Sequence, residues 1–151
     1  MNMSVAGKKI VLIGGAGFIG HNLALALSAR GADVEIVDSL QINNLNAFAA
    51  NVDNIPNRQL NLYLIQDRLE RLYAAGIPLH TIDARDYQTL SPLLGSIGPQ
   101  IIVQLAAIAH ASRANKNPFS TFDHNLRTLE NALDSSRDYV EHFIYLSSSM
   151  V

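Results

Sequence analysis

Short apolar runs alternate with segments of helical periodicity along the whole chain. The apolar runs predict strands over residues 8–13, 34–38, 79–82, 101–105 and 142–146. The run at 101–105 is apolar almost throughout, which is typical of a strand covered on both faces. This alternation predicts an α/β fold in which a parallel sheet carries helices on both of its faces.

The segments between the predicted strands have apolar positions at helical spacing and polar starts or stops. The first helix is expected over 18–30, and Gly31 ends it. A longer segment between 40 and 78 contains a helix whose polar side includes Arg68; its apolar stripe consists of Leu62, Ile65, Leu69 and Leu72. Asp86 is placed to cap a third helix. A fourth follows Pro118, and its apolar side carries Phe119, Phe122, Leu126, Leu129 and Leu133.

Composition narrows the classes of protein that need to be considered. The 151 residues fit a single domain over 1–151, with 48% hydrophobic and 16% charged residues and a net charge of −2. This balance does not suggest a nucleic-acid partner or a membrane surface. Because the chain has no cysteine and its five histidines show no ligand spacing, no metal site is expected. We expect a cytoplasmic protein, since no apolar run near the N-terminus is long enough for a signal peptide.

The first predicted strand leads into a glycine-rich turn, Gly14-Gly15-Ala16-Gly17-Phe18-Ile19-Gly20, and then into a helix. Glycines here let the backbone turn tightly, let it approach a pyrophosphate, and let the helix pack close to the strand. The start of the helix then offers free N–H groups and the positive end of its dipole. The segment predicts a dinucleotide phosphate site in a Rossmann-type, doubly wound sheet. The alternative is a tight strand-to-helix turn without a ligand.

Polar or small residues end the next three predicted strands. Asp38 ends the second strand, where a carboxylate accepts hydrogen bonds from a ribose diol and repels a 2′-phosphate. No arginine follows directly, so the sequence favours NAD over NADP, although such an Asp also starts turns. Asp83, followed by Ala84, either accepts a bond from an adenine amino group or serves as a turn residue. Leu105-Ala106-Ala107 leaves room for a flat ligand or for close helix packing.

Two further polar positions are candidates for function. Asn125 lies on the apolar stripe of the last helix, where a buried amide needs partners. It either holds the ends of the fourth and fifth strands or is an ordinary core asparagine. Ser147-Ser148-Ser149 follows the fifth strand at the carboxyl edge, where open α/β sheets bind ligands. A serine hydroxyl there can share a proton with a substrate oxygen, and a plain polar strand end is the alternative.

In order and spacing, these motifs resemble the extended short-chain dehydrogenase/reductase family, in particular its NAD-dependent nucleotide-sugar epimerases and dehydratases. The resemblance implies that NAD binds to Gly14, Gly17, Phe18, Ile19, Gly20, Asp38, Asp83, Ala84, Leu105, Ala106, Ala107 and Asn125. It implies that Ser148 is the catalytic residue that hydrogen-bonds the sugar hydroxyl being oxidised, in a reaction that removes a hydride and returns it. A nucleotide-sugar substrate and a homodimer are implied as well.

The chain also departs from the family's pattern. Ser149 and Met150 follow Ser148 where nucleotide-sugar dehydratases typically carry Asp-Glu, which favours an epimerase. Gln104 stands where a His is common. The family's Tyr-x-x-x-Lys is missing, because none of the five tyrosines has a lysine four residues on. We therefore expect the cofactor-binding, N-terminal part of a longer epimerase, truncated after the fifth strand and inactive alone. A stand-alone NAD-binding or sensing module, or a dehydratase or reductase of the family, is the alternative.

Overall fold

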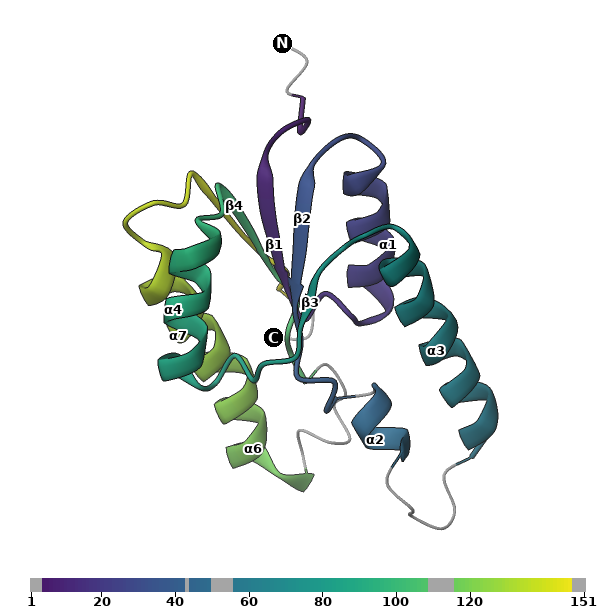
Figure 1. Ribbon diagram of the computed structural model, residues 1–151. Helices are drawn as coiled ribbons and strands as arrows, with labels where there is room; N and C mark the ends of the chain where they lie inside the picture. The colour runs from purple at the N-terminus through teal and green to yellow at the C-terminus, as the bar shows by residue number, and fades with distance from the viewer. Residues whose placement is uncertain (1–3, 43, 50–55, 109–115, 148–151) are drawn as a thin grey trace.

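A parallel sheet of five strands forms the centre of the computed structural model, which describes residues 4–42, 44–49, 56–108 and 116–147 (Figure 1). The strands are β1 Lys9–Ile13, β2 Asp33–Val37, β3 Leu79–His80, β4 Ile101–Gln104 and β5 His142–Tyr145. Their order across the sheet is β3-β2-β1-β4-β5, with every neighbouring pair parallel. The chain thus winds outward from β1 in both directions, and the predicted Rossmann-type fold is confirmed. The third strand is two residues shorter than the predicted 79–82.

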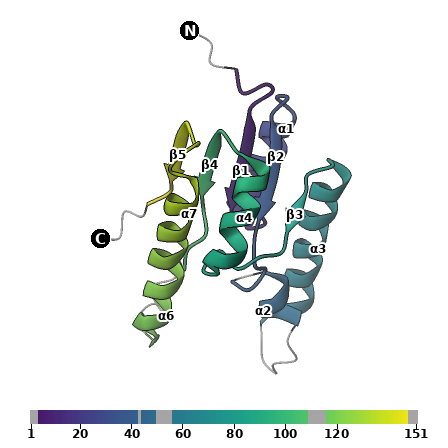
Figure 2. The same cartoon turned by 60° about the vertical axis from the view of Figure 1, so that its left-hand side comes forward.

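Helices cover both faces of this sheet, as the views in Figures 1 and 2 show. α1 and α3 lie on one face, and α4 and α7 lie on the other. The helices are α1 Phe18–Ser28, α2 Leu45–Ala49, α3 Arg58–Ala74, α4 Tyr87–Ile97, α6 Pro118–Phe122 and α7 Thr128–Ser136, with a π-helical turn, η1, at Asp123–Arg127 between the last two. The short α2 belongs to the connection between β2 and α3.

Strand β1 belongs to both cores of the molecule. Ile10 and Leu12 pack into the core with α1 and α3, whereas Val11 and Ile13 pack into the core with α4 and α7. All four side chains are almost completely buried. Burial of such a side chain contributes about 1.5–3 kcal/mol. Because it is held from both sides, β1 fixes the position of the glycine turn that follows it.

Local signals in the sequence explain where the helices begin and end. Asp86 is the N-cap of α4, and its side chain accepts the N–H of Gln88 at 3.1 Å, as predicted. Gly98 ends the same helix in the left-handed conformation, with φ +61°. On α3, Ile65 and Leu72 of the predicted stripe are buried. These helices therefore follow from capping and periodicity alone.

The helical segment after Pro118 is not the single regular helix that its periodicity suggests. The π-helical turn η1 inserts one extra residue between α6 and α7. The residues of α7 that are buried are small or polar: Thr128, Asn131, Ala132 and Ser136. Most of the predicted apolar stripe instead faces solvent, with Phe119 81% and Phe122 65% exposed. The structure thus leaves an apolar surface on this side of the molecule.

Candidate functional site

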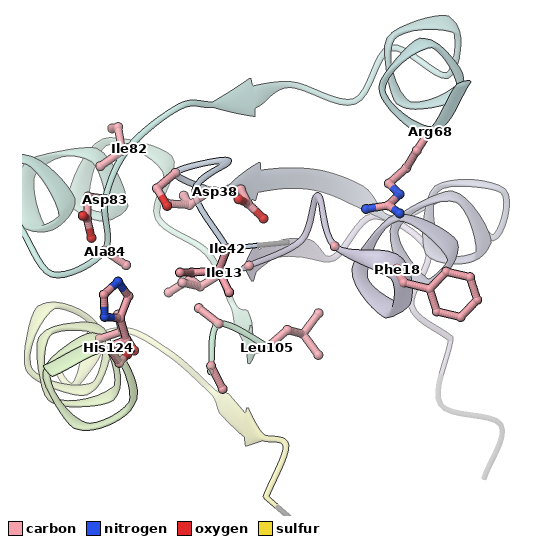
Figure 3. A pocket seen from close by; sticks show the side chains of 17 residues that line it. Ile13, Phe18, Asp38, Ile42, Arg68, Ile82, Asp83, Ala84, Leu105 and His124 are labelled. Carbon is pink, nitrogen blue, oxygen red and sulfur yellow. Dashed lines mark hydrogen bonds between the residues drawn. The ribbon is translucent and has the colours of Figure 1, made fainter. Parts of the chain in front are cut away.

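One cavity of about 260 Å³ opens at the carboxyl ends of the central strands (Figure 3). The turns after β1, β2, β3 and β4 all contribute to it, and the helical segment around η1 closes one side. Its walls are formed by Ile13, Gly14, Gly17, Phe18, Val37, Asp38, Ser39, Ile42, Arg68, Ile82, Asp83, Ala84, Leu105, Ala106, Ala107, His124 and Thr128. Most of the residues proposed for cofactor binding from the sequence therefore share a single cavity.

The glycines of the first turn have separate roles. Gly14 has φ +79°, and a Cβ placed on it would lie 2.5 Å from the backbone nitrogen of Ala106. A Cβ on Gly20 would lie 2.4 Å from the carbonyl oxygen of Gly15, so this glycine lets α1 pack against the turn. A Cβ on Gly17 would meet only the Gly14 carbonyl oxygen, at 3.4 Å, and Gly17 lines the cavity. Two of these glycines are thus needed for packing, and Gly17 leaves space for a ligand.

Within the described residues, no side chain caps the N-terminus of α1. The N-cap is Gly17, which has no side chain, and the first turn contains no acidic residue. Free N–H groups and the helix dipole therefore remain available to an anion. Phe18, which lines the cavity, is 75% exposed, whereas Ile19 and Gly20 do not contribute to its wall. This arrangement fits a phosphate group of a dinucleotide.

Asp38 is held in place by the backbone on either side of it. One carboxylate oxygen accepts the N–H of Ala16 at 3.0 Å, and the other accepts the N–H of Leu40 at 2.8 Å. Burial raises the pKa of Asp38, while these two hydrogen bonds and the positive charge of Arg68 act in the opposite direction. Asp38 therefore both starts the turn and presents a fixed carboxylate to the cavity. Each oxygen accepts only one hydrogen bond within the described residues, so each retains a lone pair.

Two residues that the sequence analysis did not select stabilise the glycine turn. The carbonyl oxygen of Ala16 accepts a hydrogen bond from Asn44 Nδ2 at 3.1 Å and another from Arg68 Nη1 at 3.0 Å. Asn44 is 1% exposed. Arg68 lies on the predicted polar side of α3, and in the structure it lines the cavity. No sequence signal points to either residue, because both come from the long segment between β2 and β3.

Asp83 takes part in an ion-pair cluster at the far side of the cavity. Arg85 donates to both of its carboxylate oxygens, at 3.0 and 2.6 Å, and also pairs with Asp123 at 2.9 Å. The side-chain hydrogen bond from Arg85 lowers the pKa of Asp83. The neighbouring Ala84 is buried, and its carbonyl oxygen accepts a hydrogen bond from Asn131 at 3.0 Å. This cluster ties the end of β3 to the helices around η1.

The end of β4 forms the floor of the cavity beneath the glycine turn. Leu105, Ala106 and Ala107 line it. Behind them Gln104 is buried, and its Nε2 donates to Thr128 Oγ1 at 3.2 Å. The ring of His124, which sequence analysis did not select, lies at the cavity wall near Asp83 and Ala84 in Figure 3. Its Nδ1 lies 2.8 Å from the Ser120 carbonyl oxygen.

Asn125, another sequence candidate, is not among the described residues that line the cavity. Asn125 is partly buried, and its Oδ1 accepts the N–H of Ile108 at 2.7 Å, while its Nδ2 donates to the Ile108 carbonyl oxygen at 3.4 Å. It therefore fastens the chain that leaves β4 to the helix. Ser148, the expected catalytic residue, lies outside the described residues, as do Ser149 and Met150.

In 4–42, 44–49, 56–108 and 116–147, no three His, Asp or Glu side chains come together as a metal site would require. Within the same ranges, every helix is too short or too polar to span a bilayer.

The model of the NAD dependent epimerase/dehydratase family matches residues 10–151. The chain belongs to this family. Protein CapI of Staphylococcus aureus is 31% identical over 144 residues, which are 95% of this chain and 38% of that protein.

Solved structures of epimerases contain the same fold. The UDP-Glc/GlcNAc 4-epimerase of Campylobacter jejuni superposes with a TM-score of 0.75 at 22% identity, over 95% of this chain and 38% of that one. The UDP-glucose 4-epimerase of Thermus thermophilus, solved in complex with NAD, gives a TM-score of 0.63 at 25% identity, over 86% of this chain and 34% of that one. This member of the family thus spans well under half the length of these relatives.

Proposed function

We propose that this chain is the NAD-binding portion of a nucleotide-sugar epimerase. One observation carries the proposal: an uncapped helix N-terminus after a glycine turn shares a cavity with a fixed carboxylate, Asp38. A dinucleotide needs this pair of features, because its pyrophosphate is anionic and its adenosine ribose carries a diol.

The residues present fit such a cofactor along the length of the cavity. The backbone at Gly17 and Phe18 would bind the pyrophosphate, and Asp38 would accept the ribose hydroxyls. Asp83 and Ala84 would flank the adenine, while the segment 105–107 would support the middle of the cofactor. When bound, NAD supplies the hydride acceptor. The role of the protein at this end is to bind and orient it.

The substrate end of the proposed reaction depends on residues near and beyond β5. We propose that Ser148 hydrogen-bonds the sugar hydroxyl that is oxidised, because it follows β5 closely in the sequence and open α/β sheets bind ligands where their strands end. The sequence contains no Tyr-x-x-x-Lys, so we propose that the proton acceptor belongs to a longer protein and that these 151 residues alone do not turn over. Ser149 and Met150 favour epimerisation over dehydration, since neither can act as an acid or base in an elimination.

Cofactor titration tests the proposal. We expect the 151-residue protein to bind NAD with at least about tenfold higher affinity than NADP, because the Asp38 carboxylate accepts from a diol and repels a 2′-phosphate. Isothermal titration calorimetry with both dinucleotides measures this ratio. Failure to bind either dinucleotide would contradict the proposed function, whereas binding with equal affinities would contradict only the assignment of Asp38.

We also propose that the protein forms a homodimer through the exposed apolar face of α6, η1 and α7. Phe119, Phe122, Leu126 and Leu133 are each more than two-fifths exposed on this face. Exposed apolar patches of this kind mark interaction surfaces. Light scattering at micromolar concentration is expected to give twice the chain mass. The F122S variant is expected to weaken the dimer at least about tenfold, while Y73S on α3, which removes an 87% exposed tyrosine, leaves it intact. A monomeric wild-type protein would overturn this assignment.

A further inference from the structure

Arg68 reaches the cavity from a part of the chain far from the glycine turn. It lies in the middle of α3, and its guanidinium extends over the turn toward the end of β2 (Figure 3). Nη1 donates to the Ala16 carbonyl oxygen at 3.0 Å. Gly17, Asp38 and Ser39 line the same cavity. A positive charge is therefore present where the ribose and phosphate ends of a dinucleotide would meet.

The hydrogen-bonding capacity of this guanidinium is not used up by the protein. An arginine has five N–H donors. Within the described residues, Arg68 makes one hydrogen bond, to Ala16, and its Nε is buried without a partner. Nη2 also has no acceptor among the described residues, so part of the guanidinium still lacks the hydrogen-bond partners that such groups usually have. Asn44 also donates to the Ala16 carbonyl oxygen, so this oxygen would keep a hydrogen-bond donor if Arg68 bonded to a ligand instead.

Asp38 and Arg68 offer opposite chemistry to the same end of the cofactor. The Asp38 carboxylate accepts from a diol, and its two oxygens are already oriented by the N–H groups of Ala16 and Leu40. The guanidinium matches a phosphate, to which it can donate two parallel hydrogen bonds. The two charges are close enough to affect each other. The repulsion of a 2′-phosphate by Asp38 is thus opposed by an attraction from Arg68.

Resting on the proposed function, we propose that Arg68 is a specificity-determining residue of the dinucleotide site: it binds the 2′-phosphate of NADP and so narrows the preference for NAD that Asp38 sets. The arginine that the sequence lacks directly after β2 is supplied by α3 instead. NAD remains the tighter ligand, and NADP is a weaker ligand that the site still accepts.

Two small probes isolate this end of the site, namely 2′,5′-ADP, which has the 2′-phosphate, and 5′-AMP, which lacks it. We expect R68Q to weaken 2′,5′-ADP about tenfold, as for one charge-assisted contact, and 5′-AMP less than threefold. R71Q is the matched control, because Arg71 lies on the same helix, is 63% exposed and pairs with Asp67. Titration calorimetry gives the affinities, and thermal unfolding reports whether each variant is folded.

The outcomes separate the possible roles of Arg68. An equal loss for both probes in R68Q would overturn the inference, since Arg68 would then serve only the turn or the 5′-phosphate. No loss for either probe would overturn it too. If R68Q does not fold, D38N provides the second test. With Arg68 in place and the Asp38 charge gone, 2′,5′-ADP is expected to bind at least about tenfold tighter than 5′-AMP, and equal affinities would contradict the inference. If wild-type protein binds neither NAD nor NADP, the proposed function itself fails.

Discussion

Replacing Asp38 with alanine is expected to weaken NAD binding by about 10²-fold or more, with NADP binding unchanged or tighter. The proposed ribose contact consists of two hydrogen bonds to a charged acceptor, each contributing about 1.5–3 kcal/mol. A loss of about 3 kcal/mol corresponds to roughly 10²-fold in affinity. NADP has no free 2′-hydroxyl to lose, and the D38A variant removes the charge that repels its phosphate. Calorimetric titration of wild type and D38A with both dinucleotides measures the change.

The D33A variant is the control for this prediction. Asp33 is exposed at the opposite end of β2, so its removal changes the net charge by the same amount without touching the cavity. D38A also removes the acceptor of two backbone N–H groups, which can loosen the turns that contain them. Such loosening would weaken the binding of NAD and of NADP to a similar extent. A parallel loss of NAD and NADP binding would therefore contradict the role of Asp38 in cofactor choice.

Burial raises the pKa of Asp38, so its carboxylate becomes protonated on acidification while the pH is still above the ordinary value of 3.8. We therefore expect the NAD affinity of the wild type to fall in this pH range, and the NAD affinity of D38A to show no such fall.

Two glycine substitutions are expected to separate folding from cofactor binding. A Cβ on Gly20 would lie 2.4 Å from a backbone oxygen of Gly15, and neither α1 nor β1 can move without disturbing a core. We expect G20A to lower the free energy of unfolding by about 3 kcal/mol, at the upper end for overpacking. For a chain of this length, that corresponds to a melting temperature lower by about 10 °C. Thermal and urea unfolding measure this effect.

G17A is the matched variant, with the opposite expected profile. The added methyl group meets only one backbone atom, at 3.4 Å, and Gly17 has an ordinary negative φ of −73°. Stability should therefore change by less than about 1 kcal/mol. The methyl group projects where the pyrophosphate would approach, so NAD affinity should fall by about tenfold or more. If G17A binds NAD as tightly as wild type, the phosphate is not held at this turn.

Elements that depend on a few neighbouring residues could be predicted from the sequence. Contacts that depend on how distant segments of the chain fold against each other could not. The apolar run of β1, the glycine turn and the Asp86 cap are each specified by a few neighbouring residues, and all three appear as expected. The sequence places Arg68 on the polar side of a helix, which is correct for the helix taken alone. The long connection from β2 then places that side over the cavity, a tertiary effect that periodicity does not encode.

The helix after Pro118 shows a different limit of sequence reasoning. Its large apolar residues make up the apolar side that the sequence predicts for this helix. The buried residues of α7, which contacts α4, are instead small or polar, such as Thr128, Ala132 and Ser136. Small side chains allow the helices to approach closely, so burial here does not follow hydrophobicity. The role of Ser148 stays a prediction, because it rests on the position of that residue after β5.

The π-helical turn at Asp123–Arg127 has a consequence for how this surface can change by mutation of the gene. Successive residues of an α-helix are about 100° apart around its axis, so one residue gained or lost rotates everything on one side of the change by that angle. A deletion of a single codon within η1 would turn the aromatic residues of α6 away from their present direction and leave α7 against α4. The same event would swing His124 relative to the cavity wall. A single-codon deletion in η1 would therefore change the outward face of α6 and the shape of the cavity at the same time.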